Sequence, residues 1–107
     1  MPKYLFSGSY TLEGLRGLIK EGGSARKAQI QSTVKGLGGK LEAYYFAFGG
    51  NDVIAILDFP DNISYAAVAL AVNAAGGFKG TTSVLLSPEE VDQATKKKVL
   101  YRGPGGE

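Results

Sequence analysis

The sequence contains no cysteine, no histidine and no tryptophan. Without cysteine and histidine the chain lacks thiol nucleophiles, disulfides, the usual ligands of zinc and iron–sulfur sites, and imidazole as a general base or haem ligand. Any chemistry therefore has to come from carboxylates, lysine, tyrosine, hydroxyl groups or backbone amides. We accordingly expect neither a metal nor a cofactor.

A strongly basic surface and a long apolar run are also missing. Residues 1–95 carry eight basic and nine acidic side chains, whereas residues 96–107 carry four and one, so the net charge of +2 belongs to the end of the chain. The longest uncharged stretch, residues 62–78, is polar in places and short for a bilayer span of about 20 apolar residues. The sequence predicts no nucleic-acid partner, no membrane contact and, without a secretory signal after Met1, a cytoplasmic location.

Glycine, by contrast, is abundant: the 107 residues include 16 glycines, ten of them in five Gly-Gly pairs. Four pairs separate segments of different periodicity and mark element boundaries, and the fifth lies in a Gly/Pro-rich end. We expect a single domain over residues 1–98 and a flexible tail over residues 99–107. No glycine-rich phosphate-binding motif follows the first expected strand.

Hydrophobic periodicity predicts the order β-α-β-β-α-β with a short C-terminal helix. Strands are expected over residues 3–10, 40–48, 52–59 and 78–86. A helical region is expected from residue 11 to the Gly38-Gly39 pair, broken at Gly22-Gly23 and restarted with Ser24 as N-cap. Gly49-Gly50-Asn51 is expected to form a tight hairpin with positive φ. Ser87-Pro88-Glu89-Glu90 predicts a capping box that opens a helix ending with the Lys96–Lys98 run.

The helix expected after Pro60-Asp61-Asn62 carries no charge. The 3.6-residue period selects as its inner stripe Ile63, Ala66, Ala67, Leu70, Ala71 and Ala74. Its outer stripe still holds Val68, Ala69 and Val72, and a helix that is apolar all round is normally buried. The element order predicts an α+β, ferredoxin-like βαββαβ fold with a four-stranded antiparallel sheet, central first and third strands, and helices on one face.

The strand over residues 52–59 is apolar on both faces, so both faces of the sheet require cover. We therefore expect a homo-oligomer, most simply a dimer whose sheets face each other. A small ligand between the sheets would be lined by alternate strand residues. By parity with Leu5 the candidates are Ser7, Ser9, Glu42, Tyr44, Asp58, Thr81 and Ser83.

Asp58 stands out because a carboxylate in an apolar central strand can act as an acid or base, although at a strand end it would simply lie in water or cap the loop before Pro60. Asp52 would serve either as a functional acid or as a hairpin residue. Tyr10 would donate to a ligand or pack in the sheet. Arg26 would hold a carboxylate or phosphate, or form an ion pair.

Single residues and short motifs, mostly of turn and capping type, are spread over the first 98 residues: Tyr4, Gly8-Ser9-Tyr10-Thr11, Gly14, Arg26, Leu37-Gly38-Gly39-Lys40-Leu41, Gly49-Gly50-Asn51-Asp52, Pro60-Asp61, Thr81-Thr82 and Ser87-Pro88-Glu89-Glu90. In these motifs the chain resembles the GYD domain family, small bacterial proteins with a ferredoxin-like fold of the dimeric α/β barrel type. Asn51 stands where the family's motif has tyrosine, so a role of that tyrosine would not carry over. The resemblance implies the fold and oligomerisation, and no established activity.

The sequence therefore predicts a cytoplasmic homo-oligomer that binds a small metabolite or has a role in assembly. The alternative is a cofactor-independent enzyme, an isomerase or oxygenase, with Asp58 or Glu42 as base and a tyrosine as donor in the space between the sheets. The lack of histidine favours binding over catalysis.

Overall fold

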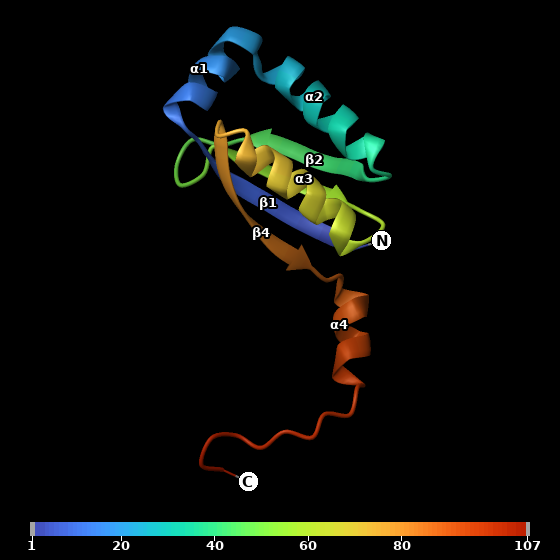
Figure 1. Cartoon of the computed structure of the whole chain (residues 1–107). Helices are drawn as coiled ribbons and strands as arrows, with labels where there is room; N and C mark the ends of the chain where they lie inside the picture. The colour runs from blue at the N-terminus through green and yellow to red at the C-terminus, as the bar shows by residue number, and fades with distance from the viewer. Residues whose placement is uncertain (1, 107) are drawn as a thin grey trace.

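The computed structural model describes residues 2–106 and contains four strands and four helices (Figure 1). The elements are β1 (Lys3–Tyr10), α1 (Leu12–Glu21), α2 (Gly23–Gly36), β2 (Lys40–Phe46), β3 (Val53–Asp58), α3 (Asn62–Ala74), β4 (Phe78–Leu85) and α4 (Pro88–Thr95). The strands form one antiparallel sheet in the order β2-β3-β1-β4. The predicted α+β, ferredoxin-like arrangement with β1 and β3 in the centre is confirmed.

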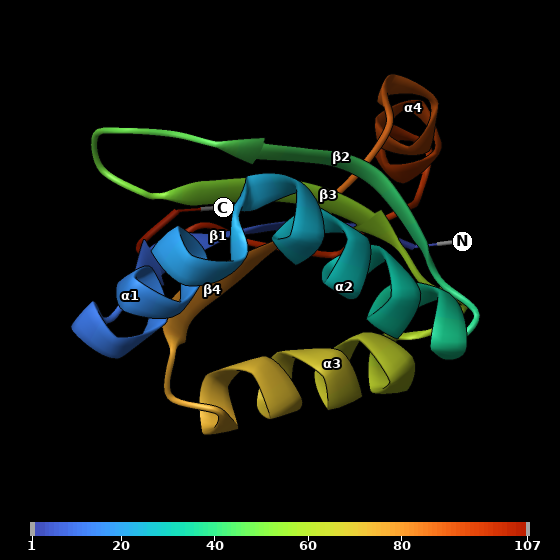
Figure 2. The same cartoon turned by 90° about the horizontal axis from the view of Figure 1, so that it is seen from above.

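Helices α1, α2 and α3 lie on one side of the sheet, which we call the helix-side face (Figure 2). Along β3, Val53, Ala55 and Leu57 are buried on this side, whereas Ile54 and Ile56 point to the other side and keep part of their surface exposed. The opposite side, the open face, comprises Lys3, Leu5, Ser7, Ser9, Lys40, Glu42, Ala43, Tyr45, Ile54, Ile56, Asp58, Lys79, Thr81, Ser83 and Leu85.

A β-bulge in β2 changes which residues share a face. The register between β2 and β3 shifts between Leu41 and Ala43, so Glu42 is the extra residue of the bulge. The weak alternation that the sequence shows along this strand is therefore interrupted at the bulge. Leu41 and Tyr44 both lie on the helix-side face and pack against the core, whereas Glu42 lies on the open face.

The core lies under the helices at the end of the sheet where β3 terminates. Phe59 and Val34 are fully buried there. The ring of Tyr4 stacks on that of Tyr65 with centroids 4.1 Å apart, and Phe59 meets Tyr65 edge-on at 5.6 Å. Aromatic pairs of this kind add to the stabilisation that burial alone provides.

The two stripes of α3 are exchanged relative to the prediction. Val68 is buried and Ala69 and Val72 pack against the core, whereas Ile63 and Leu70 are largely exposed. Because both stripes are apolar and neither is charged, hydrophobic contrast does not distinguish them. The start of the helix follows the prediction, since the Asp61 carboxylate accepts a hydrogen bond from the Ser64 amide at 2.7 Å.

Three local predictions are wrong in detail. The N-cap of α2 is Gly22, with φ of 92°, and Ser24 lies inside the helix. The hairpin between β2 and β3 spans residues 47–52, and neither Gly49 nor Gly50 has positive φ. Helix α4 begins with the predicted capping box at Ser87 but ends at Thr95, so the lysine run follows the helix instead of forming its last turn.

Helix α4 and the residues after it project away from the rest of the chain (Figure 1). The molecule is accordingly elongated, with extents of 58 × 32 × 22 Å. Apolar side chains along this arm are exposed, among them Val99, Leu100 and Tyr101. The boundary between the domain and a flexible tail near residue 98 stays a prediction.

Candidate functional site

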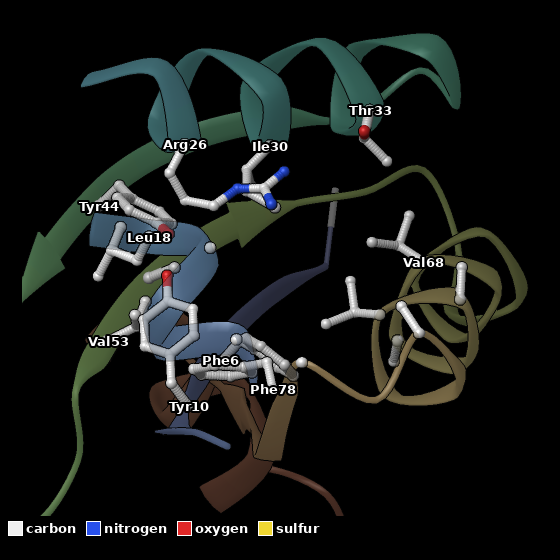
Figure 3. Close-up of a pocket in the computed structure, with 18 of the residues that line it drawn as sticks. Phe6, Tyr10, Leu18, Arg26, Ile30, Thr33, Tyr44, Val53, Val68 and Phe78 are labelled. Carbon is white, nitrogen blue, oxygen red and sulfur yellow. The ribbon is translucent and has the colours of Figure 1, made fainter. Parts of the chain in front are cut away.

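A cavity of about 380 Å³ lies between the helix layer and the helix-side face of the sheet (Figure 3). Small-molecule sites in proteins typically have volumes of about 300–1,000 Å³ and mostly apolar walls. The walls here are formed by Phe6, Tyr10, Gly14, Gly17, Leu18, Glu21, Arg26, Ile30, Thr33, Tyr44, Val53, Ala55, Leu57, Tyr65, Val68, Ala69, Ala71, Val72, Ala75, Gly77 and Phe78.

Small residues on the helices create this space. The backbone of α1 approaches the turn before β4 so closely that a Cβ on Gly14 would lie 1.8 Å from the carbonyl oxygen of Gly77. One turn later the helix has room, because a Cβ on Gly17 would meet nothing within 4 Å. Across the cavity α3 contributes Ala69 and Ala71 in place of larger side chains.

The Arg26 side chain extends from α2 into this region (Figure 3). Its Nε is buried and has no hydrogen-bond partner, the one such side-chain nitrogen or oxygen in residues 2–106. The nearest carboxylate is that of Glu21, whose Oε2 lies 3.6 Å from Nη1. A buried donor without a partner is unfavourable. A hydrogen-bond acceptor that reached this nitrogen from the cavity would remove that cost.

Two tyrosines place hydroxyl groups beside the same cavity. In Figure 3 the hydroxyl of Tyr10, on β1, points toward that of Tyr44, on β2. Burial, followed by the interaction with the Tyr10 hydroxyl, raises the pKa of Tyr44 well above its ordinary value, and burial also raises the pKa of Tyr10. Both phenols therefore stay protonated at neutral pH and are available as hydrogen-bond donors.

The structure thus brings together three of the predicted site residues on the helix-side face: Tyr10, Tyr44 and Arg26. The expectation that Tyr44 shares a face with Glu42 is wrong, because the bulge at Glu42 turns the two side chains to opposite sides of the sheet.

The other predicted strand residues lie on the open face: Ser7, Ser9, Glu42, Asp58, Thr81 and Ser83. Here Lys3 is the central group, since its Nζ donates to Asp58 Oδ1 at 2.8 Å and also bonds to the Glu42 carboxylate. These hydrogen bonds raise the pKa of Lys3, so the ammonium stays charged. Both candidate bases are therefore ion-paired in this chain.

Asp52 has a structural contact. Its carboxylate accepts a hydrogen bond from the Tyr10 amide at 3.0 Å, and its own amide donates to the Gly8 carbonyl at 2.7 Å. These bonds fasten the end of β1 to the hairpin. The interpretation of Asp52 as a hairpin residue matches this geometry.

Sequence reasoning missed the helix-derived walls of the cavity, in particular Gly17, Leu18, Ile30 and Thr33. It placed the ligand between two sheets and thus looked for strand residues only. A usable signal was present in the two glycines inside α1 and the alanines of α3, because small residues in helices that pack on a sheet leave space beneath them.

Within residues 2–106 no cluster of three or more acidic, histidine or cysteine side chains is placed to bind a metal ion. Among the helices of this described part, none combines the length and apolarity required to cross a bilayer.

The family model of the GYD domain matches residues 4–95, an interval that extends from β1 to the end of α4. Comparisons with curated proteins and with solved structures gave no match.

Proposed function

The chain belongs to the GYD domain family, and from its geometry we propose that it binds a small, largely apolar molecule between its helix layer and its sheet. The observation that carries this proposal is the cavity of about 380 Å³, whose walls are apolar except for a few polar groups gathered around Arg26. Protein interiors are normally packed to the density of organic crystals, so a space of this size favours an occupant.

The test uses an uncharged fluorescent probe, N-phenyl-1-naphthylamine, whose emission rises when it leaves water. Gly17→Leu should reduce probe binding at least tenfold, because the new side chain starts from a wall of the cavity at a position where a Cβ meets nothing within 4 Å. The variant should fold, since leucine is a better helix former than glycine.

Gly36→Leu is the matched control. Gly36 also lies in a helix and also has no atom within 4 Å of a Cβ position, but it does not line the cavity. This variant should bind the probe as the unaltered protein does. Equal binding by both variants would place the probe on an exposed apolar surface and would overturn the proposal.

An assembly role is favoured by a second observation, and we propose that the open face packs against the same face of a second copy. The face presents Leu5, Ile54 and Ile56, and its two carboxylates are neutralised in part by Lys3. A face with an apolar centre, on which Lys3 already partners both carboxylates, suits a two-fold contact that buries the same patch of both copies.

The catalytic alternative has weaker support. Its candidate bases, Glu42 and Asp58, are both bound to Lys3, so each carboxylate already has a partner within the chain. We therefore favour binding over an isomerase or oxygenase reaction between the sheets, and we retain the cytoplasmic location as part of the proposal.

A further inference from the structure

We propose that the molecule in the cavity carries an anionic head group, a carboxylate, which pairs with Arg26, while its apolar remainder lies between α1, α3 and the sheet. This inference rests on the proposed function, because it names the class of ligand that the same cavity would take.

The first argument comes from the guanidinium. Arginine presents its donors in a planar fork that matches the two oxygens of a carboxylate, and one edge of that fork includes Nε. In Arg26 the Nε is buried and unpartnered, and Glu21 approaches only the Nη1 nitrogen, at 3.6 Å. The edge that includes Nε therefore keeps an unused donor that a planar anion would match.

The second argument comes from charge. Arg26 is the one basic residue among the walls of the cavity in the described chain, and Glu21 is the one acidic residue. The two side chains are similarly exposed to solvent, at 31% for Arg26 and 34% for Glu21, so exposure does not distinguish them. Of the two charged groups, the arginine is the one with an unsatisfied buried atom, which favours an anion over a cation.

The third argument comes from the two phenols. The hydroxyls of Tyr10 and Tyr44 adjoin the cavity and bond to each other, so this pair of protonated phenols keeps one hydroxyl hydrogen to donate to a carboxylate oxygen. The rest of the wall, including Phe6, Leu18 and Ile30, offers no charged side chain to a second polar group. One anionic end and one apolar body are the chemistry that these walls match.

The experiment measures displacement of N-phenyl-1-naphthylamine by octanoate and by octan-1-ol, which share a chain length and differ in the head group. In the unaltered protein octanoate should displace the probe at a concentration at least tenfold below that of octan-1-ol. Arg26→Gln should abolish this preference, since it leaves the cavity with Glu21 alone. Glu21→Gln should increase the preference for octanoate, because it removes the competing carboxylate.

Arg16→Gln is the matched control, because Arg16 is an exposed arginine of α1 that does not line the cavity. It should leave the preference unchanged, which separates a direct contact from a general effect of net charge. If octan-1-ol displaces the probe as well as octanoate does, and Arg26→Gln changes neither value, the anionic head group is refuted while the proposed function stands. If neither compound displaces the probe and Gly17→Leu does not weaken its binding, the proposed function itself is refuted.

Discussion

The two faces of one sheet differ in the way in which their side chains are satisfied. On the helix-side face, apolar residues are covered within the chain, but the cover is incomplete and leaves a cavity with an unpartnered arginine nitrogen. On the open face Lys3 is paired with Glu42 and Asp58, and apolar residues such as Ile54 keep part of their surface in water. The first face therefore has an internal cavity, and the second has an exposed apolar surface.

The exposed apolar surface of the open face follows from the sequence of the strands, because their side chains alternate between the two faces. In β3 the even-numbered residues Ile54 and Ile56 are as apolar as their odd-numbered neighbours, and the charged Asp58 comes at the end of the strand. A sheet with one solvated face would alternate apolar and polar residues instead. This difference supports the two proposals, ligand binding at the helix-side face and assembly through the open face, which separate variants can test.

The largest effect is expected in the core under the helix-side face. Phe59→Ala removes a fully buried ring that contacts Tyr4 and Tyr65, and it should lower the free energy of unfolding by about 3–5 kcal/mol. Urea denaturation checks this value. Phe48→Ala is the control, because Phe48 is 98% exposed and its loss should change stability by at most about 0.5 kcal/mol. Similar losses in the two variants would contradict this description of the core.

A second large effect is expected on assembly. Ile54→Lys places a charge in the middle of the open face, where the side chain is 39% exposed in the single chain, and it should convert a dimer into a monomer without unfolding it. Light scattering measures the mass. Ile63→Lys introduces the same charge on the exposed side of α3, where it should leave the proposed dimer intact. A monomeric mass for the unaltered protein would remove the basis of this assignment.

These two predictions depend on elements whose existence the sequence indicates well. Strand alternation in β1, the capping box at Ser87 and the glycine at the end of α2 each have a local physical cause, and the structure contains all three. The prediction of which side of α3 is buried was wrong because both sides of this helix are apolar. The bulge at Glu42 depends on pairing with β3, a contact between distant segments that local periodicity does not encode.

The candidate site was predictable only in part, for a related reason. Arg26, Tyr10 and Tyr44 were recognisable as residues with useful chemistry, but three separate elements bring them to one cavity. The cavity is space that the side chains of the helices and the sheet leave unfilled. The sequence indicates this space only indirectly, through the small residues Gly17 and the alanines of α3.

A moderate effect is expected within α1, where two glycines one turn apart have different surroundings. Gly14→Ala brings a Cβ to 1.8 Å from the Gly77 carbonyl oxygen, so backbone must move and stability should fall by about 1–3 kcal/mol. Gly17→Ala meets no atom within 4 Å and should raise stability by about 0.5–1 kcal/mol through better helix propensity. Thermal unfolding of the two variants checks the opposite signs, and equal signs would mean that α1 packs differently from this description.

The smallest effect concerns alkaline pH. The folded state raises the pKa of Tyr44 above the ordinary tyrosine value of about 10, so the folded protein holds that proton more tightly than the unfolded chain. Its contribution to stability is fully present below about pH 10 and is lost as the pH rises further. Urea unfolding should show a smaller alkaline loss for Tyr44→Phe than for the unaltered protein. Tyr101→Phe, in the exposed arm, should leave the loss unchanged.

The proposal that a ligand binds at the helix-side face and not at the open face is tested most directly by nuclear magnetic resonance. The experiment records which amide resonances octanoate shifts in a nitrogen–proton correlation spectrum. Our account predicts that the shifted amides cluster on the cavity walls, including Gly17, Arg26 and Gly77, and that Ser7 and Thr81 on the open face do not shift. Shifts confined to the amides of the open face would contradict it.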